Sequence, residues 1–145
     1  MQSLIKHWHG ILNMKKHDLA WHKQDMIDEI EEFREANGLI HKWSELSDVS
    51  YTYTRAQWSG HKDIKFPFKK VYLYIGFIYM VPKYTIRWKF FRTLGKKFDI
   101  NLMISEVRNP KKTHKLEDIA ERYNLNPIEF KEQAERLKKR WLFLN

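Results

Sequence analysis

Residues 28–49 read DEIEEFREANGLIHKWSELSDV, and they contain the boundary between two expected helices. Asn37-Gly38 is a common helix stop, so it separates two expected helices. Apolar residues recur at helical spacing on both sides of this stop, which gives each helix one apolar stripe. The stripes consist of Met26, Ile30 and Phe33 in the first helix and of Leu39, Leu46, Val49 and Tyr53 in the second.

Two pairs of carboxylates border these stripes. Glu29 and Glu32 lie beside the first stripe, and Glu45 and Asp48 lie beside the second, with a spacing of i,i+3 in each pair. If the stripes pack together, all four carboxylates meet at one seam. Carboxylates at close range repel one another and resist burial, so we expect a divalent cation between them. The alternative is two solvated helix faces bonded to Lys and Arg.

The composition is that of a folded protein without cysteine chemistry. Its 145 residues correspond to about one domain, and 43% hydrophobic residues exclude wholesale disorder. The absence of Cys excludes disulfides and thiol nucleophiles and is compatible with a reducing compartment, so we expect a cytoplasmic protein. Met1–Lys16 has no apolar core typical of a signal peptide. The longest apolar run, Val71–Val81, is shorter than the roughly 20 residues of a membrane span, so no membrane contact is expected.

The periodicity predicts an all-α protein with two parts. A helical bundle is expected over residues 1–107 and a small helical hairpin over residues 108–145, with Arg108–Lys112 as the linker. Phe68–Val81 is ambiguous between strand and helix, and helix is favoured because a lone strand has no partner. Pro82 is expected to break or kink this helix, after which residues 85–98 continue as a basic helix. The expected helices are residues 1–16, 18–36, 39–58, 68–81, 85–98, 115–123 and 127–141.

The hairpin has the pattern of a helix-turn-helix. Its two helices flank Asn124-Leu125-Asn126, and the second helix ends in Lys138-Lys139-Arg140. Such a pair can read DNA. Many helical hairpins that bind nothing share this pattern, so a purely structural tail is the alternative.

The net charge of +9 is unevenly distributed along the chain. Trp21–Asp48 carries three Lys or Arg against eight Asp or Glu, whereas Lys62–Lys97 carries ten against one. An acidic helical pair followed by a basic segment suits a site that holds metal on one side and phosphates on the other. An ordinary solvated basic face is the alternative.

The acidic stretch resembles the signature of the all-α nucleoside triphosphate pyrophosphohydrolases, the MazG-like superfamily that includes dimeric dUTPases. That signature is ExxE, a spacer of a dozen or more residues, and then ExxD. Glu29 and Glu32 match the first pair, and Glu45 and Asp48 match the second, with 12 residues between Glu32 and Glu45. The match covers about residues 18–58, and the aromatic segment Phe66–Tyr84 and the residues beyond Arg108 have no counterpart in it.

The resemblance implies a MazG-like helical bundle in which Glu29, Glu32, Glu45 and Asp48 hold Mg²⁺, with Mn²⁺ as a possible substitute. Water activated by the metal and a carboxylate would cleave a nucleoside triphosphate between its α and β phosphates, which releases a monophosphate and pyrophosphate. These four residues would thus be both catalytic and metal-binding.

Cationic side chains are expected to hold the phosphates of the substrate. Arg55 lies seven residues after Asp48, hence on the same face of its helix, and Lys96 and Lys97 are further candidates.

Three kinds of partner are expected besides the nucleotide. The aromatic surplus of Val71–Val81 and of Tyr51, Tyr53 and Trp58 predicts a homodimer or a higher homo-oligomer. Nucleic acid is a candidate partner of the basic C-terminal half, so a nucleic-acid-binding or regulatory protein on a MazG-like scaffold is the main alternative function. The third function considered is a protein-interaction module, in which the exposed aromatics contact a partner protein.

Overall fold

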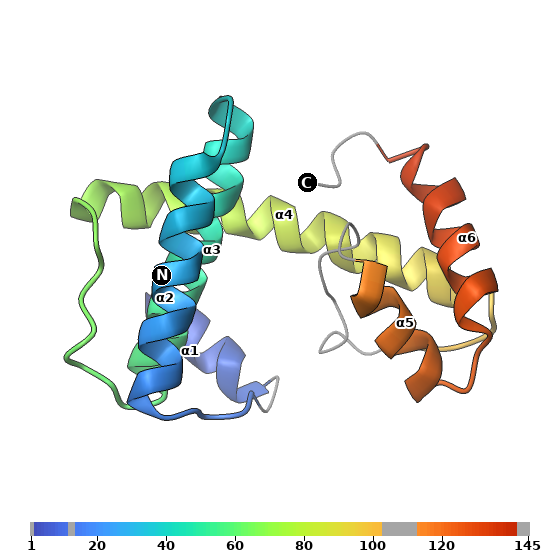
Figure 1. Cartoon of the computed structure of the whole chain (residues 1–145), viewed down its shortest axis with the longest axis horizontal. Helices are drawn as coiled ribbons and strands as arrows, with labels where there is room; N and C mark the ends of the chain where they lie inside the picture. Colours follow the sequence, from blue (N-terminus) through green and yellow to red (C-terminus); the bar gives the residue numbers. More distant parts are fainter. Residues whose placement is uncertain (1, 12–13, 103–112, 142–145) are drawn as a thin grey trace. The chain divides into compact units, whose positions relative to one another are not determined.

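The structure, a computed structural model, describes residues 2–11, 14–102 and 113–141 of the chain. These residues form six α-helices and no strand, which confirms the all-α prediction. None of the described helices is long and apolar enough to cross a membrane. The helices are α1 (Gln2–Ile11), α2 (Leu19–Glu35), α3 (Leu39–Trp58), α4 (Lys70–Lys96), α5 (Thr113–Arg122) and α6 (Pro127–Lys138) (Figure 1).

The chain divides into two compact units that meet within α4, between Val81 and Pro82. The expected boundary at residues 107 and 108 and the expected linker lie outside the described residues. The division falls earlier because the second half of α4 supplies core residues to the same cluster as α5 and α6. We therefore describe the N-terminal unit, residues 1–81, and the C-terminal unit, residues 82–145, separately.

The expectation for Pro82 was a break or a kink, and the break is absent, because α4 runs through Pro82. A proline inside a helix removes the hydrogen bond to the carbonyl four residues earlier, here that of Ile78. Both Pro82 and Ile78 are exposed, so water can reach this part of the helix. The cost of the missing hydrogen bond is therefore reduced at this position.

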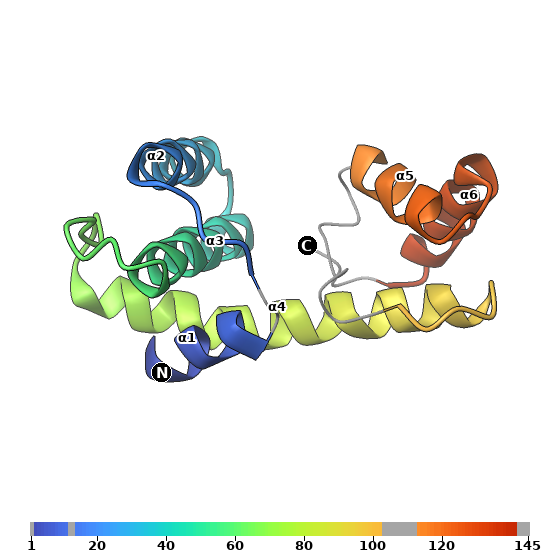
Figure 2. The same cartoon turned by 90° about the horizontal axis from the view of Figure 1, so that it is seen from below.

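The N-terminal unit is built on the antiparallel hairpin of α2 and α3 (Figures 1 and 2). The Asp18 carboxylate caps α2 by accepting the Trp21 backbone N–H at 2.8 Å. Gly38 precedes α3 with φ of 82°, in the left-handed region that favours glycine. The buried residues between the helices are Met26 of α2 and Val49 and Ala56 of α3, with Ile64 from the loop that follows.

One expected member of the apolar stripe is outside this core. The Leu39 side chain is 64% exposed, so its assignment to the stripe was wrong. Leu39 is the first residue of α3, next to the turn at Gly38. Its side chain lies at the end of the hairpin, where no neighbouring helix covers it. The interior positions Met26 and Val49 are buried as predicted.

A face of α3 rich in small hydroxyl residues lets α4 approach closely. The hydroxyls of Ser47, Ser50 and Thr54 each donate a hydrogen bond to a carbonyl one turn earlier in α3, so they are buried without an unsatisfied donor. Gly76 of α4 packs on this face. A Cβ atom at Gly76 would lie 2.1 Å from Ser50 Oγ and 2.9 Å from the Leu46 carbonyl oxygen.

Gly76→Ala is expected to destabilise the N-terminal unit despite the higher helix propensity of alanine. Overpacking of this kind costs about 1–3 kcal/mol, whereas the propensity gain is roughly 1 kcal/mol. Urea unfolding of the variant measures the balance. Gly10→Ala is the matched control, because Gly10 is a helical glycine whose added Cβ has nothing within 4 Å. A Gly76→Ala protein as stable as the wild type would refute the close contact.

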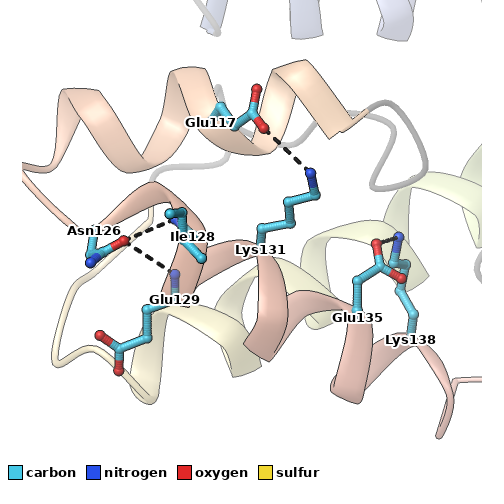
Figure 3. Close-up of polar contacts among 7 residues, drawn as sticks. All are labelled: Glu117, Asn126, Ile128, Glu129, Lys131, Glu135 and Lys138. Carbon is cyan, nitrogen blue, oxygen red and sulfur yellow. Dashed lines mark hydrogen bonds and ion pairs between the residues drawn. The ribbon is translucent and has the colours of Figure 1, made fainter.

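The C-terminal unit joins the second half of α4 to the α5–α6 hairpin around one core. The turn between α5 and α6 contains Asn124, whose φ of 53° lies in the left-handed region that asparagine tolerates. The Asn126 side chain then caps α6 by accepting the backbone N–H groups of Ile128 and Glu129 (Figure 3). The fully buried core residues are Phe90 and Leu94 of α4, Leu116, Ile119 and Ala120 of α5, and Phe130 and Ala134 of α6.

Candidate metal centre

Three carboxylates from the two helices of the N-terminal hairpin converge at its seam. Glu29 and Glu32 come from α2 and Glu45 comes from α3, and one carboxylate oxygen of each lies within 4.8 Å of the others. Among the described residues, no other three His, Cys, Asp or Glu side chains meet this criterion. The packing of the two apolar stripes therefore brings together three of the four carboxylates that the sequence singled out.

Glu29 is the carboxylate most strongly affected by this arrangement. Its Oε2 atom is buried and has no hydrogen-bond partner among the described residues. Burial, followed by the negative charges of Asp48 and Glu32, raises the pKa of Glu29 to about 8. Glu29 therefore carries a proton at neutral pH when no cation is bound. A bound cation would favour the ionised form and displace this proton.

Glu45 and Glu32 differ in their exposure to solvent. The Glu45 side chain is 13% exposed, and its Oε1 atom lies 3.2 Å from Nε2 of His41, one turn earlier in α3. His41 thus orients this carboxylate from the solvent-exposed side of the helix. Glu32 is exposed at the surface of α2. The cluster therefore has a covered side at Glu29 and an open side at Glu32.

Asp48, the fourth residue of the predicted set, lies one turn after Glu45 and is half-buried. It is not among the three residues with converging oxygens, but its charge contributes to the raised pKa of Glu29. Asp25 is a further member of the seam that the sequence interpretation missed. Burial raises its pKa, and its carboxylate hydrogen-bonds Thr52 of α3. Its position four residues before Glu29, on the same helix face, was the signal that could have identified it.

Arg55 lies two helical turns beyond Asp48 in α3, next to the segment that connects α1 and α2. Its Cζ atom is 4.7 Å from the centre of the Trp21 ring, and Nη2 donates to the Lys15 carbonyl at 3.4 Å. Its Nε atom is buried without a partner among the described residues. The positive charge of Arg55 also lowers the pKa of Asp25 and so opposes the effect of burial there.

Two buried histidines of the same unit are affected by the charge of this arginine, which adds to the effect of burial in lowering the pKa of each. The side chains of His9 and His22 are both fully buried, and burial, the main cause, lowers the pKa of each to about 4. Neither ring has a hydrogen-bond partner among the described residues. The His22 ring instead packs against the rings of Trp21 and His61, with centroids 5.0 and 5.1 Å away. Both histidines are therefore neutral packing residues at physiological pH.

Lys96 and Lys97, the other predicted phosphate contacts, belong to the C-terminal unit. Both are exposed at the end of α4. The Nζ atom of Lys97 donates to Oε1 of Gln133 in α6 at 3.2 Å. Their assignment to the nucleotide stays a prediction, whereas Arg55 shares the N-terminal unit with the carboxylates.

No protein-family model, curated protein or solved structure matches this chain. The likeness to the MazG-like superfamily therefore stays an expectation that rests on the ExxE and ExxD pairs. The chemistry of the site must be inferred from its own residues.

The donor set of this cluster indicates the class of ion that fits it. All three converging groups are carboxylates, and hard divalent cations such as Mg²⁺ prefer oxygen ligands. The buried, unpartnered oxygen of Glu29 offers a ligand atom that the protein itself does not satisfy. The exposed side at Glu32 leaves room for the waters that Mg²⁺ retains and for phosphate oxygens.

Proposed function

We propose that this protein is a Mg²⁺-dependent nucleoside triphosphate pyrophosphohydrolase that releases a nucleoside monophosphate and pyrophosphate. The observation that carries the proposal is the convergence of Glu29, Glu32 and Glu45 within 4.8 Å at the seam of two packed helices. Their spacing in the sequence is also that of the ExxE and ExxD pairs. Mn²⁺ has similar ligand preferences and is expected to substitute.

In the proposed reaction Glu29, Glu32 and Glu45 bind the cation, and Asp48 adds negative charge beside them. The bound Mg²⁺ would supply charge neutralisation and an acidified water. A carboxylate of the set accepts a proton from the attacking water. The water oxygen forms a bond to the α-phosphorus while the bond from this phosphorus to the bridging oxygen breaks, and pyrophosphate leaves.

Arg55 is the proposed phosphate contact within the same unit. It lies about 10 Å along the helix from Asp48 at 1.5 Å per residue, on the same face. A guanidinium group binds phosphate oxygens through its N–H donors, and the Nε–H of Arg55 has no acceptor among the described residues. Lys96 and Lys97 are not required for this arrangement.

A panel of ribo- and deoxynucleoside triphosphates assayed with Mg²⁺ tests the proposal. We expect equimolar pyrophosphate and monophosphate from at least one of them and no free orthophosphate. Chelation of the metal should abolish both products. A panel that yields orthophosphate and diphosphate, or no product at all, would refute the proposed reaction.

An exposed apolar stripe on α4 supports the proposed homodimer. Leu73, Phe77 and Met80 of this helix are buried, whereas Ile78 and Val81 are 66% and 69% exposed. Exposed apolar surface of this kind marks interaction sites. A second copy of the chain, which carries the same stripe, is the proposed partner.

The homodimer predicts that Ile78→Glu lowers the molar mass in light scattering from two chains to one at micromolar concentration. A charge placed at an apolar interface opposes association because it must lose its water. Ile27→Glu is the matched control, since Ile27 is an exposed isoleucine of α2, away from this stripe. A wild-type protein that is monomeric at these concentrations would contradict the proposal.

A further inference from the structure

The C-terminal unit contains most of the positive charge of the protein. Residues 82–145 carry sixteen Lys or Arg against eight Asp or Glu, a net charge of +8 out of a total of +9. The proposed catalytic groups of the N-terminal unit leave this charge unexplained. Its distribution between α4 and α6 indicates where a polyanion can bind.

The cations of α6 are engaged by carboxylates of the same unit. Lys131 pairs with Glu117 at 3.5 Å and Arg136 pairs with Glu132 at 3.8 Å. Lys138 pairs with Glu135 (Figure 3). A helix-turn-helix protein would place this second helix in the major groove. Because its cations are already paired, α6 is poorly suited to contact phosphates.

The second half of α4 presents the opposite arrangement. Lys89, Arg92 and Lys96 are exposed, and within the described part of the chain none of them has a carboxylate partner. Their i,i+3 and i,i+7 spacing places them in one straight row of about 11 Å along the helix. Four consecutive phosphates of one DNA strand span a similar length, about 10 Å at roughly 3.4 Å of axis per nucleotide. We refer to these three residues as the α4 basic row.

We propose that the α4 basic row binds the sugar-phosphate backbone of double-stranded DNA without reading its sequence. The row offers charge but no base-reading geometry, so contacts to phosphates are the ones it can make. It contains none of the carboxylates that form the cluster of the N-terminal unit.

Two other polyanionic partners fit less well. A membrane surface requires exposed apolar side chains beside the basic ones, but in this helix half Phe90, Phe91 and Leu94 are buried in the core and Ile86 and Trp88 are half-buried. Proteins that bind single-stranded nucleic acid add aromatic rings, on which the bases stack, to a positively charged groove. The Trp88 ring is half-buried and lies 5.5 Å from the Arg92 guanidinium, which competes for it. Binding to the backbone of duplex DNA requires neither exposed apolar side chains nor accessible aromatic rings.

Fluorescence anisotropy with a labelled 20-base-pair duplex of mixed sequence, at several salt concentrations, tests this proposal. For three phosphate contacts, log K should fall with log[salt] with a slope of about −2.7. The triple substitution of Lys89, Arg92 and Lys96 by Gln should weaken binding at least tenfold at low salt and move the slope toward zero. An unrelated duplex sequence should bind equally well.

The matched control replaces Lys131, Arg136 and Lys138 of α6 by Gln, which removes the same number of positive charges. We expect this variant to bind DNA within about twofold of the wild type. Equal losses in both triple variants would show that only net charge matters and would overturn the assignment to α4. Tighter binding of the corresponding single strand, or binding to anionic phosphatidylserine vesicles but not to the duplex, would also overturn it. Far-ultraviolet circular dichroism checks that each variant remains folded.

Discussion

Glu45→Gln is expected to reduce kcat/KM for triphosphate hydrolysis by at least about 100-fold, since even residues that only support a metal ligand contribute 10–100-fold. The amide keeps the size of the side chain but removes the negative charge that binds the cation. The variant should remain folded, because Glu45 lies at the seam and not in the apolar core. Steady-state assays of pyrophosphate release on the preferred nucleotide provide the measurement.

Glu31→Gln is the matched control for this substitution. Glu31 lies on α2 between Glu29 and Glu32, but it is exposed and outside the carboxylate cluster. Its replacement changes the net charge by the same amount. We expect its kcat/KM to stay within about twofold of the wild type. Equal activities of the two variants would show that hydrolysis does not depend on the carboxylate cluster.

Replacement of His22 by Phe is expected to reduce the loss of folding stability at acidic pH. The folded-state pKa of His22 is lowered to about 4 from 6.5, so the unfolded chain binds a proton between these values and the folded chain does not. Wild-type stability therefore falls as the pH decreases from about 6.5 to about 4, by on the order of 3 kcal/mol from this ring. A phenyl ring cannot take up the proton, so the variant lacks this loss.

Urea unfolding at pH 7 and at pH 4.5 measures the effect. The difference in unfolding free energy between the two pH values should be smaller in His22→Phe than in the wild type. His7→Phe is the control, because His7 is an exposed histidine of α1. If the larger ring prevents folding, His22→Gln gives the same comparison. An unchanged pH dependence in both His22 variants would contradict the buried, neutral state of this side chain.

The parts of the fold that follow from local patterns could be predicted from the sequence. The carboxylate of Asp18, the stop at Asn37-Gly38 and the apolar spacing of residues 39–58 are local signals, and they place α2 and α3 correctly. The helical spacing of Glu29 and Glu32 also predicts their common face, because a side chain's direction on a helix depends only on its position in the sequence.

Other features depend on contacts that local patterns do not contain. The course of α4 through Pro82 depends on the exposure of that turn to solvent, and the unit boundary depends on which core receives Phe90 and Leu94. The burial of His22 arises from packing against Trp21 and His61, which are distant from each other in the sequence. Leu39 was misassigned because periodicity alone does not show where the partner helix ends.

The most direct test of a metal centre at the seam is the melting temperature of the wild type and of Glu29→Gln with and without Mg²⁺ at pH 8.5. At this pH the Glu29 carboxyl, with a pKa of about 8, is mostly ionised and ready to bind the cation. Mg²⁺ at 100 times its dissociation constant should add about 2.7 kcal/mol to the wild-type stability and raise its melting temperature. At pH 6.5 the increase should be smaller, because the cation must then displace a proton.

The glutamine variant should melt no lower than the wild type at pH 6.5 without Mg²⁺, because its amide resembles the protonated carboxyl in size and charge. With Mg²⁺ at pH 8.5, its melting temperature should stay unchanged. A Glu29→Gln protein that gains as much from Mg²⁺ as the wild type, or a wild type that gains nothing, would contradict a metal centre at this seam.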